Sequence, residues 1–258
     1  MLQRSFDHMH GSEKAHSPMF ARMDDGYLVP WILRVHAIAG GIALVVAPLA
    51  MALPKGGTWH RRWGKAYFYS MVVVCITAVV LGIAHYKRSF WLALVGVFSF
   101  HLVASGYRSL YLKKLHEGLK PQPTDLWLHG IAGTVNGGLL IWGLAHLLMG
   151  QRDTKAMLFT VFGAIGSYMV VIQLHRFYKR KHDKREWFYG HISGMLGAYI
   201  ATLSAFSAVN LEMIRPTWLK WLWPTLVGVP LIILWTGHYR RRFAKGARVR
   251  DMAEVRIR

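Results

Sequence analysis

The chain has 258 residues, of which 53% are hydrophobic and only 17% are charged. This composition excludes a disordered chain, which would be poorer in aliphatic and aromatic side chains. The single cysteine, Cys75, excludes an intramolecular disulfide, and thiolate zinc or iron–sulfur sites need more cysteines than the chain has. Long uncharged segments alternate with short basic ones, and this distribution predicts an integral membrane protein.

Seven segments are long and apolar enough to cross a bilayer. A transmembrane helix needs about 20 mostly apolar residues to span a hydrocarbon core of about 30 Å. Tryptophan or tyrosine stands near many ends of these segments, as in the aromatic belts at membrane interfaces. The predicted fold is therefore an all-α bundle of seven transmembrane helices, at 31–53, 66–85, 90–107, 126–149, 156–175, 187–211 and 217–239.

The excess of basic residues sets the expected orientation. The chain carries 32 lysines and arginines against 12 acidic residues, and most of the basic ones fall on one side if seven helices alternate in direction. By the positive-inside rule this side is cytoplasmic, so the N-terminus is outside and the C-terminus inside. We expect a polar outer tail at 1–29, a transmembrane domain at 30–239 and a basic cytoplasmic tail at 240–258. The basic residues are expected to meet anionic lipid headgroups rather than nucleic acid.

A short motif occurs twice in the predicted spans. His36-Ala-Ile-Ala-Gly40 in the first span matches His129-Gly-Ile-Ala-Gly133 in the fourth. The two copies lie three spans apart, so their helices enter the membrane from opposite sides. The match is compatible with an inverted repeat of spans one to three and four to six, with the seventh appended. Chance similarity between apolar helices is the alternative.

The ionisable side chains inside the predicted spans are almost all histidines. All twelve acidic residues lie at span ends or outside the spans, whereas pumps and proton-coupled transporters commonly use buried carboxylates. At a rise of about 1.5 Å per residue, His129 and His191 lie at nearly equal depth near the inner face. His36 and His146 are a rougher match in the outer leaflet, and His101 lies near mid-membrane. A b-type haem between helices needs such pairs, so His129 with His191 is the predicted site, and His36 with His146 or His101 a second one.

Small and basic residues accompany these histidines. Gly40, Gly133 and Gly194 each lie about one turn after a histidine, where they would leave room for a flat porphyrin. Arg61 near the inner interface and Arg34 near the outer one are candidates for binding the haem propionates. The alternative is that the imidazoles lie at headgroup level and that the glycines are ordinary contacts between membrane helices.

Two stretches carry a resemblance to a known family. The first reads His60-Arg61-Arg62-Trp63-Gly64-Lys65-Ala66-Tyr67 and opens the second span. The second, at 191–201 with Gly194, Met195 and Tyr199, lies in the sixth span. They resemble a family of bacterial multi-spanning membrane proteins that is classified only as a domain of unknown function. The resemblance implies a multi-pass protein of the bacterial inner (plasma) membrane and carries no activity.

A looser, architectural similarity is to the two-haem membrane b-type cytochromes, which also hold histidine pairs in helical bundles. The chain departs from them in having seven spans and no glycine-rich nucleotide fingerprint. A reductase of this kind would therefore take its electrons from a quinol or from a redox partner protein.

His60 belongs to the family motif, and we expect it on a short inner loop before the second span. There it either ligates a cofactor at the inner face or, with Arg61 and Trp63, anchors the loop to headgroups.

Three functions remain open at this point. The first is a haem b protein that transfers electrons with a quinone or a partner protein. The second is a non-catalytic accessory subunit of a larger membrane complex, and the third is a small-solute transporter with its site between the repeats.

Overall fold

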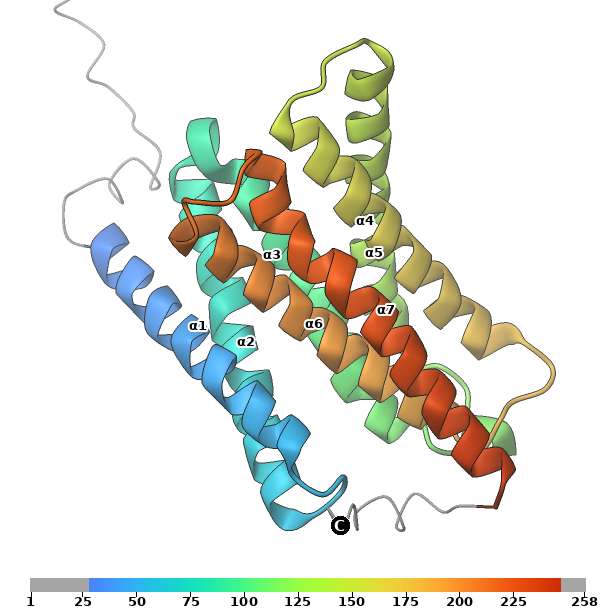
Figure 1. Cartoon of the computed structure of the whole chain (residues 1–258). Coiled ribbons are helices and arrows are strands. Elements are labelled where there is room, and N and C mark those ends of the chain that lie inside the picture. Colours follow the sequence, from blue (N-terminus) through green and yellow to red (C-terminus); the bar gives the residue numbers. More distant parts are fainter. Residues whose placement is uncertain (1–27, 247–258) are drawn as a thin grey trace, which may run out of the picture.

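The computed structural model describes residues 28–246, apart from the side chains of residues 86–89. In this range the chain forms seven long α-helices. Two short 3-10 helices, η2 (Ser109–Tyr111) and η3 (Leu115–Glu117), lie in the connection between the third and the fourth. The long helices, shown in Figure 1, are α1 (Leu28–Ala52), α2 (Thr58–Ala84), α3 (Tyr86–Arg108), α4 (Pro123–Leu148), α5 (Thr154–Tyr178), α6 (Glu186–Asn210) and α7 (Thr217–Ala244).

The predicted class of fold is confirmed. The structure contains seven helices whose length and hydropathy are sufficient to cross a membrane. Large apolar side chains are exposed along the outside of the bundle, among them Ile38, Ile141 and Leu234. A surface of this kind is stable in lipid and would be costly in water, so the protein is a multi-pass membrane protein.

Two helix ends differ most from the predicted span ends. α2 begins at Thr58 rather than at Ala66, so His60 lies in its first turn and not in a loop. α7 continues to Ala244 and includes the first residues of the predicted basic tail. Hydropathy ends where charged residues begin, but helical hydrogen bonding continues into the interface, where long basic side chains reach the headgroups. Most of the predicted tails, at 1–27 and 247–258, lies outside the described residues.

One end of the bundle collects the basic segments. The α1–α2, α3–α4 and α5–α6 connections and the C-terminus of α7 all lie at the lower end in Figure 1. We call this the basic end, because Lys55, Lys113, Lys179 and Arg240 lie there. Successive helices therefore run in opposite directions, as the prediction of orientation from the basic residues assumed.

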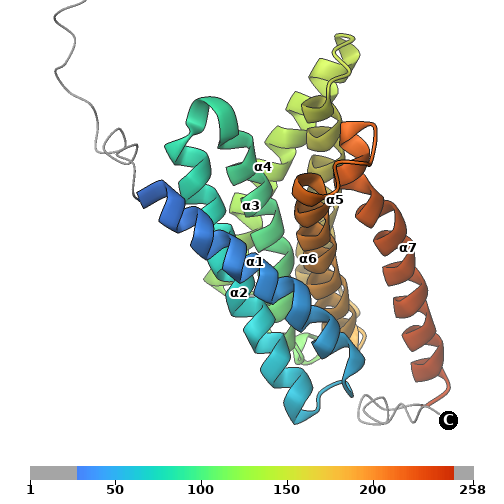
Figure 2. The same cartoon turned by 60° about the vertical axis from the view of Figure 1, so that its left-hand side comes forward.

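α6 lies at the centre of the bundle. It packs against α1, α3 and α7, and Figure 2 shows it between the α1–α2 pair and α7. α3 and α6 cross at glycines, since a Cβ atom on Gly194 would lie only 2.5 Å from Gly106 Cα. The apolar core beside this crossing includes Met71, Val103 and Ala198. Small residues therefore fix the spacing of the two central helices.

The two halves of the bundle have different neighbours. α2 packs along both α1 and α3, whereas α5 packs mainly on α4, with smaller contacts to α3 and α7. The two copies of the repeated motif also differ, because His36 is partly exposed and His129 is buried. The inverted repeat stays a prediction from the sequence that the helix packing does not favour.

Candidate functional site

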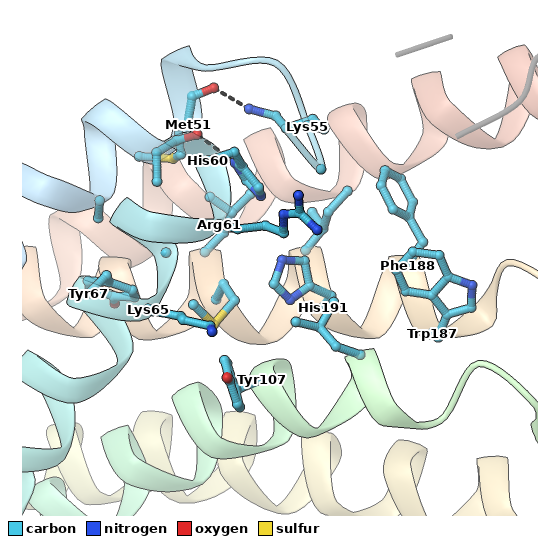
Figure 3. Close-up of a pocket in the computed structure, with 18 of the residues that line it drawn as sticks. Met51, Lys55, His60, Arg61, Lys65, Tyr67, Tyr107, Trp187, Phe188 and His191 are labelled. Carbon is cyan, nitrogen blue, oxygen red and sulfur yellow. Dashed lines mark hydrogen bonds between the residues drawn. The ribbon is translucent and has the colours of Figure 1, made fainter. Parts of the chain in front are cut away.

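A cavity of about 420 Å³ lies at the basic end, bounded by α1, α2, α6, α7 and the segment that follows α3. This volume is typical of small-molecule sites, which measure about 300–1,000 Å³. Figure 3 shows His60 and Arg61 entering it from α2, and His191 and Trp187 from α6. We call this space the basic cavity.

The turn before α2 positions His60. Gly56 takes a backbone φ of 80°, a left-handed conformation that suits glycine, and Gly57 N donates to Pro54 O at 3.1 Å. This turn returns α2 alongside the end of α1. His60 Nδ1 then lies 2.8 Å from Ala50 O. Because a carbonyl oxygen only accepts, Nδ1 carries the proton and Nε2 of the neutral ring has the free lone pair.

His191 is held in the same way from the other side of the cavity. Its Nδ1 lies 3.1 Å from Gly106 O on α3 and donates to it, which again leaves Nε2 with the lone pair. The close crossing of Gly106 and Gly194 brings this carbonyl within reach. A backbone acceptor on the second ring nitrogen is the arrangement that orients metal-bound histidines.

The two imidazoles lie at the spacing of a pair of axial ligands. Their ring centroids are 6.5 Å apart, and the rings are inclined by 76°. A metal–imidazole bond of about 2 Å and about 1 Å from nitrogen to ring centre place two opposite ligands about 6 Å apart. The distance between the two ring centroids, and the Nδ1 hydrogen bonds that leave both Nε2 atoms unprotonated, are compatible with such coordination.

Positive charge around the cavity is not neutralised by acidic residues. Lys55, Arg61, Lys65 and Lys113 line it, and no acidic residue does in the part of the chain that the structure describes. Burial lowers the pKa of Lys55, which donates to the Met51 carbonyl. An occupant with negative charge would compensate these cations.

Two acidic residues at the basic end are paired outside the cavity. Asp125 Oδ1 accepts from Arg108 Nε at 2.5 Å, and Glu186 forms an ion pair with Lys179. Neither carboxylate is available to neutralise the cavity.

The structure pairs the predicted ligand His129 with His101 instead of His191. His101 Nε2 and His129 Nδ1 share a hydrogen bond of 3.0 Å in the buried interior between α3 and α4. An iron atom with two bonds of about 2 Å would hold these nitrogens about 4 Å apart, so the pair as it stands leaves no room for one. His191 faces His60, and the residue pairing expected from depth is not the one observed.

The outer candidates do not converge. His36 Nδ1 bonds Thr77 Oγ1 at 2.9 Å, which ties α1 to α2. His146 Nδ1 bonds Trp142 O on its own helix at 2.9 Å. Arg34 lies over the Trp31 ring, with 4.8 Å from Cζ to the centroid. These side chains satisfy local partners on separate helices, so the structure assembles no second site from them.

The candidate glycines serve different purposes. The backbone of α3 fills the space beside Gly194, so this glycine forms a contact between helices and leaves no room for a porphyrin. A Cβ atom on Gly133 would meet Val170 of α5 at 3.4 Å, and one on Gly40 would meet nothing within 4 Å. For Gly194 the alternative interpretation, a contact between membrane helices, is the one observed.

The sequence did not indicate that Lys55 and Lys113 line a cavity. For His60 it left two alternatives open, a cofactor ligand or an anchor to headgroups. The HRRWGK stretch is visible in the sequence, but nothing in it indicates that the start of α2 faces the start of α6. Arg61, predicted as a propionate ligand, lines the cavity, and its binding role stays a prediction.

No protein-family model, curated protein or solved structure significantly matches this chain, so the resemblances noted from the sequence stay expectations.

Proposed function

We propose that the protein binds a b-type haem in the basic cavity, with His60 and His191 as axial ligands, and acts in membrane electron transfer. The observation that carries the proposal is the histidine pair, with centroids 6.5 Å apart and both Nδ1 atoms bound to backbone carbonyls. A porphyrin supplies four nitrogens itself and needs only two from the protein. This fits a protein in which the described residues form no group of three or more His, Cys, Asp or Glu that could hold a metal ion by itself.

The rest of the lining suits the same ligand. Haem carries two propionates, and Arg61, Lys65 and Lys113 offer cations at the mouth of the cavity. Tyr107 and Trp187 provide aromatic surface for a flat macrocycle. Bound haem supplies one-electron chemistry, since its iron alternates between ferric and ferrous states. The lining residues would hold the haem and set its orientation.

The other functions considered from the sequence have weaker support. A transporter needs a site that can alternate between the two faces, but the basic cavity lies at one end only. An accessory subunit would not need two imidazoles whose Nδ1 atoms are bound to backbone carbonyls. It would also not need a cavity lined by cations without acidic partners.

The test is the spectrum and haem content of the purified protein. We expect protein purified in mild detergent from haem-sufficient cells to hold about one haem per chain with a low-spin bis-histidine spectrum. His60→Ala and His191→Ala should each abolish that spectrum, because one axial ligand is lost. His146→Ala is the matched control, since this imidazole bonds its own helix, and it should leave the spectrum unchanged.

Three results would count against the proposal. A colourless protein that elutes as a folded monodisperse species would remove haem altogether. Retention of the low-spin spectrum in both variants would exclude these ligands. Loss of the low-spin spectrum in His129→Ala but not in His60→Ala would favour His129 and His191 as the ligands.

A further inference from the structure

A second hollow of about 430 Å³ lies between α2, α3 and α4, and we call it the lateral groove. Its rim includes Phe100, Trp127 and Ile131, which are 36%, 72% and 55% exposed. Apolar side chains exposed on the outside of a membrane bundle face lipid chains. The lateral groove therefore opens sideways into the bilayer, and a molecule dissolved in the membrane can reach it without crossing water.

The inner wall of the groove carries a buried polar chain. His101 lines it and is fully buried, with Nε2 bound to His129 Nδ1 at 3.0 Å and no partner for Nδ1 among the described residues. Asp125, one turn before His129 on α4, also lines the groove and is fully buried. Buried polar atoms are nearly always paired, so the Nδ1 atom of His101 marks a place where a ligand oxygen can bind.

The charge balance of the groove differs from that of the basic cavity. Arg108 lines it too, but its guanidinium is bound by Asp125 through Nε at 2.5 Å and Nη2 at 3.0 Å. With this pair neutralised, an occupant needs no net charge. Phe68 and Trp127 add aromatic surface that packs well on a flat ring. A phosphate headgroup in the groove would find no free cation among the described lining residues to bind it, because Arg108 is bound by Asp125. An acyl chain alone would leave His101 Nδ1 without a hydrogen-bond partner.

The lateral groove and the basic cavity share a wall. Tyr107 and Tyr111 line both, and their ring centroids are 5.9 Å apart. Phe68 stacks on Tyr107 from the groove side at 4.2 Å. The lateral groove and the basic cavity are therefore adjacent at these two tyrosines.

We propose that the lateral groove binds a lipid-soluble quinone or its quinol, with a ring oxygen hydrogen-bonded to His101 and the apolar tail in the bilayer. The ligand has the features that the groove selects: a neutral flat ring, oxygen atoms that donate or accept, and a hydrophobic tail. Its redox role rests on the proposed haem in the basic cavity, but its binding does not. The hydrogen bond to His129 lets His101 act as donor or acceptor toward the oxygen by exchange of tautomers.

Photo-crosslinking of the full-length protein with an azido-substituted ubiquinone analogue tests this proposal. We expect crosslinks to map to residues 97–111 and 124–132, and to be suppressed by decylubiquinone. Ile131→Trp should block labelling by filling the groove, whereas Ile141→Trp, on the same helix and 71% exposed, should not. His101→Phe should weaken competition by decylubiquinone about tenfold, the effect of losing one buried hydrogen bond.

The same labelling of His191→Ala separates the two proposals. Groove-specific labelling of this haem-free variant, or of a wild-type protein that proves colourless, supports the quinone site even though the haem assignment fails. Labels spread evenly over the lipid-facing helices would overturn the quinone site while leaving a haem spectrum intact. Labelling that excess phospholipid suppresses as well as decylubiquinone does would overturn it too, since an acyl chain would then be the occupant.

Discussion

A Gly194→Ala variant is expected to lose much of the stability of the bundle. The added Cβ atom would lie 2.5 Å from Gly106 Cα, 2.6 Å from Gly106 N and 2.8 Å from Leu102 O. All three are backbone atoms, so no side-chain rotation relieves the clash and α3 must move away from α6. Overpacking of this kind costs about 1–3 kcal/mol, and we expect the upper end, a fall in thermal midpoint of about 10 °C in detergent.

The same displacement should reach the proposed haem site. Gly106 supplies the carbonyl that holds His191 Nδ1, so separating α3 from α6 breaks the bond that orients the imidazole. Gly197→Ala is the control, because its Cβ atom would meet Leu102 Cδ2 at an ordinary 3.6 Å. Alanine also favours helix by about 1 kcal/mol over glycine, so this variant should be as stable as the parent or more stable. Equal losses in both variants would show that the α3–α6 crossing is not the tight contact described.

The number of helices could be predicted from the sequence because burial in lipid depends on hydropathy along the chain. The partner of each histidine could not be predicted, because it depends on the rotation of each helix as well as on the depth of the residue in the membrane. His129 and His191 have similar depth, but α4 and α6 both pack on α3, and the rotation of each helix aims the two rings at different neighbours. That rotation is set by small-residue contacts such as Gly106 with Gly194.

The position of His60 inside a helix could not be predicted from hydropathy. Arg61, Arg62 and Lys65 lower the local hydropathy, so the predicted span began after them, although the helix begins at Thr58. The sequence also shows that the inner loops are basic without showing which cations lack a partner. That distinction appears only when Asp125 and Glu186 are seen bound to other cations.

Removing the Asp125 carboxylate is the second change from which we expect a large effect. Asp125 is fully buried, pairs with Arg108 and accepts from Gln122 N at 2.8 Å in the capping box that begins α4. Asp125→Ala removes the carboxylate from the guanidinium, which keeps a hydrogen bond to Gln122 Oε1, and leaves the backbone amide of Gln122 without its acceptor. Breaking a buried ion pair costs about 3–5 kcal/mol and a lost cap about 1 kcal/mol. Because the Arg108 side chain is 23% exposed, water offsets part of this, and we expect about 3 kcal/mol, measured as a lower thermal midpoint.

A double-mutant cycle distinguishes this pair from a surface contact. Arg108→Leu combined with Asp125→Leu should be less destabilised than either single variant, since no charge is then left buried without its partner. Glu117→Ala is the control, because Glu117 and Lys114 form an exposed pair at 3.8 Å that should contribute well under about 1 kcal/mol. Additive losses in the cycle would contradict a coupled pair. They would also mean that Arg108 keeps free charge toward the lateral groove, and the groove would then favour an anionic occupant over a neutral quinone.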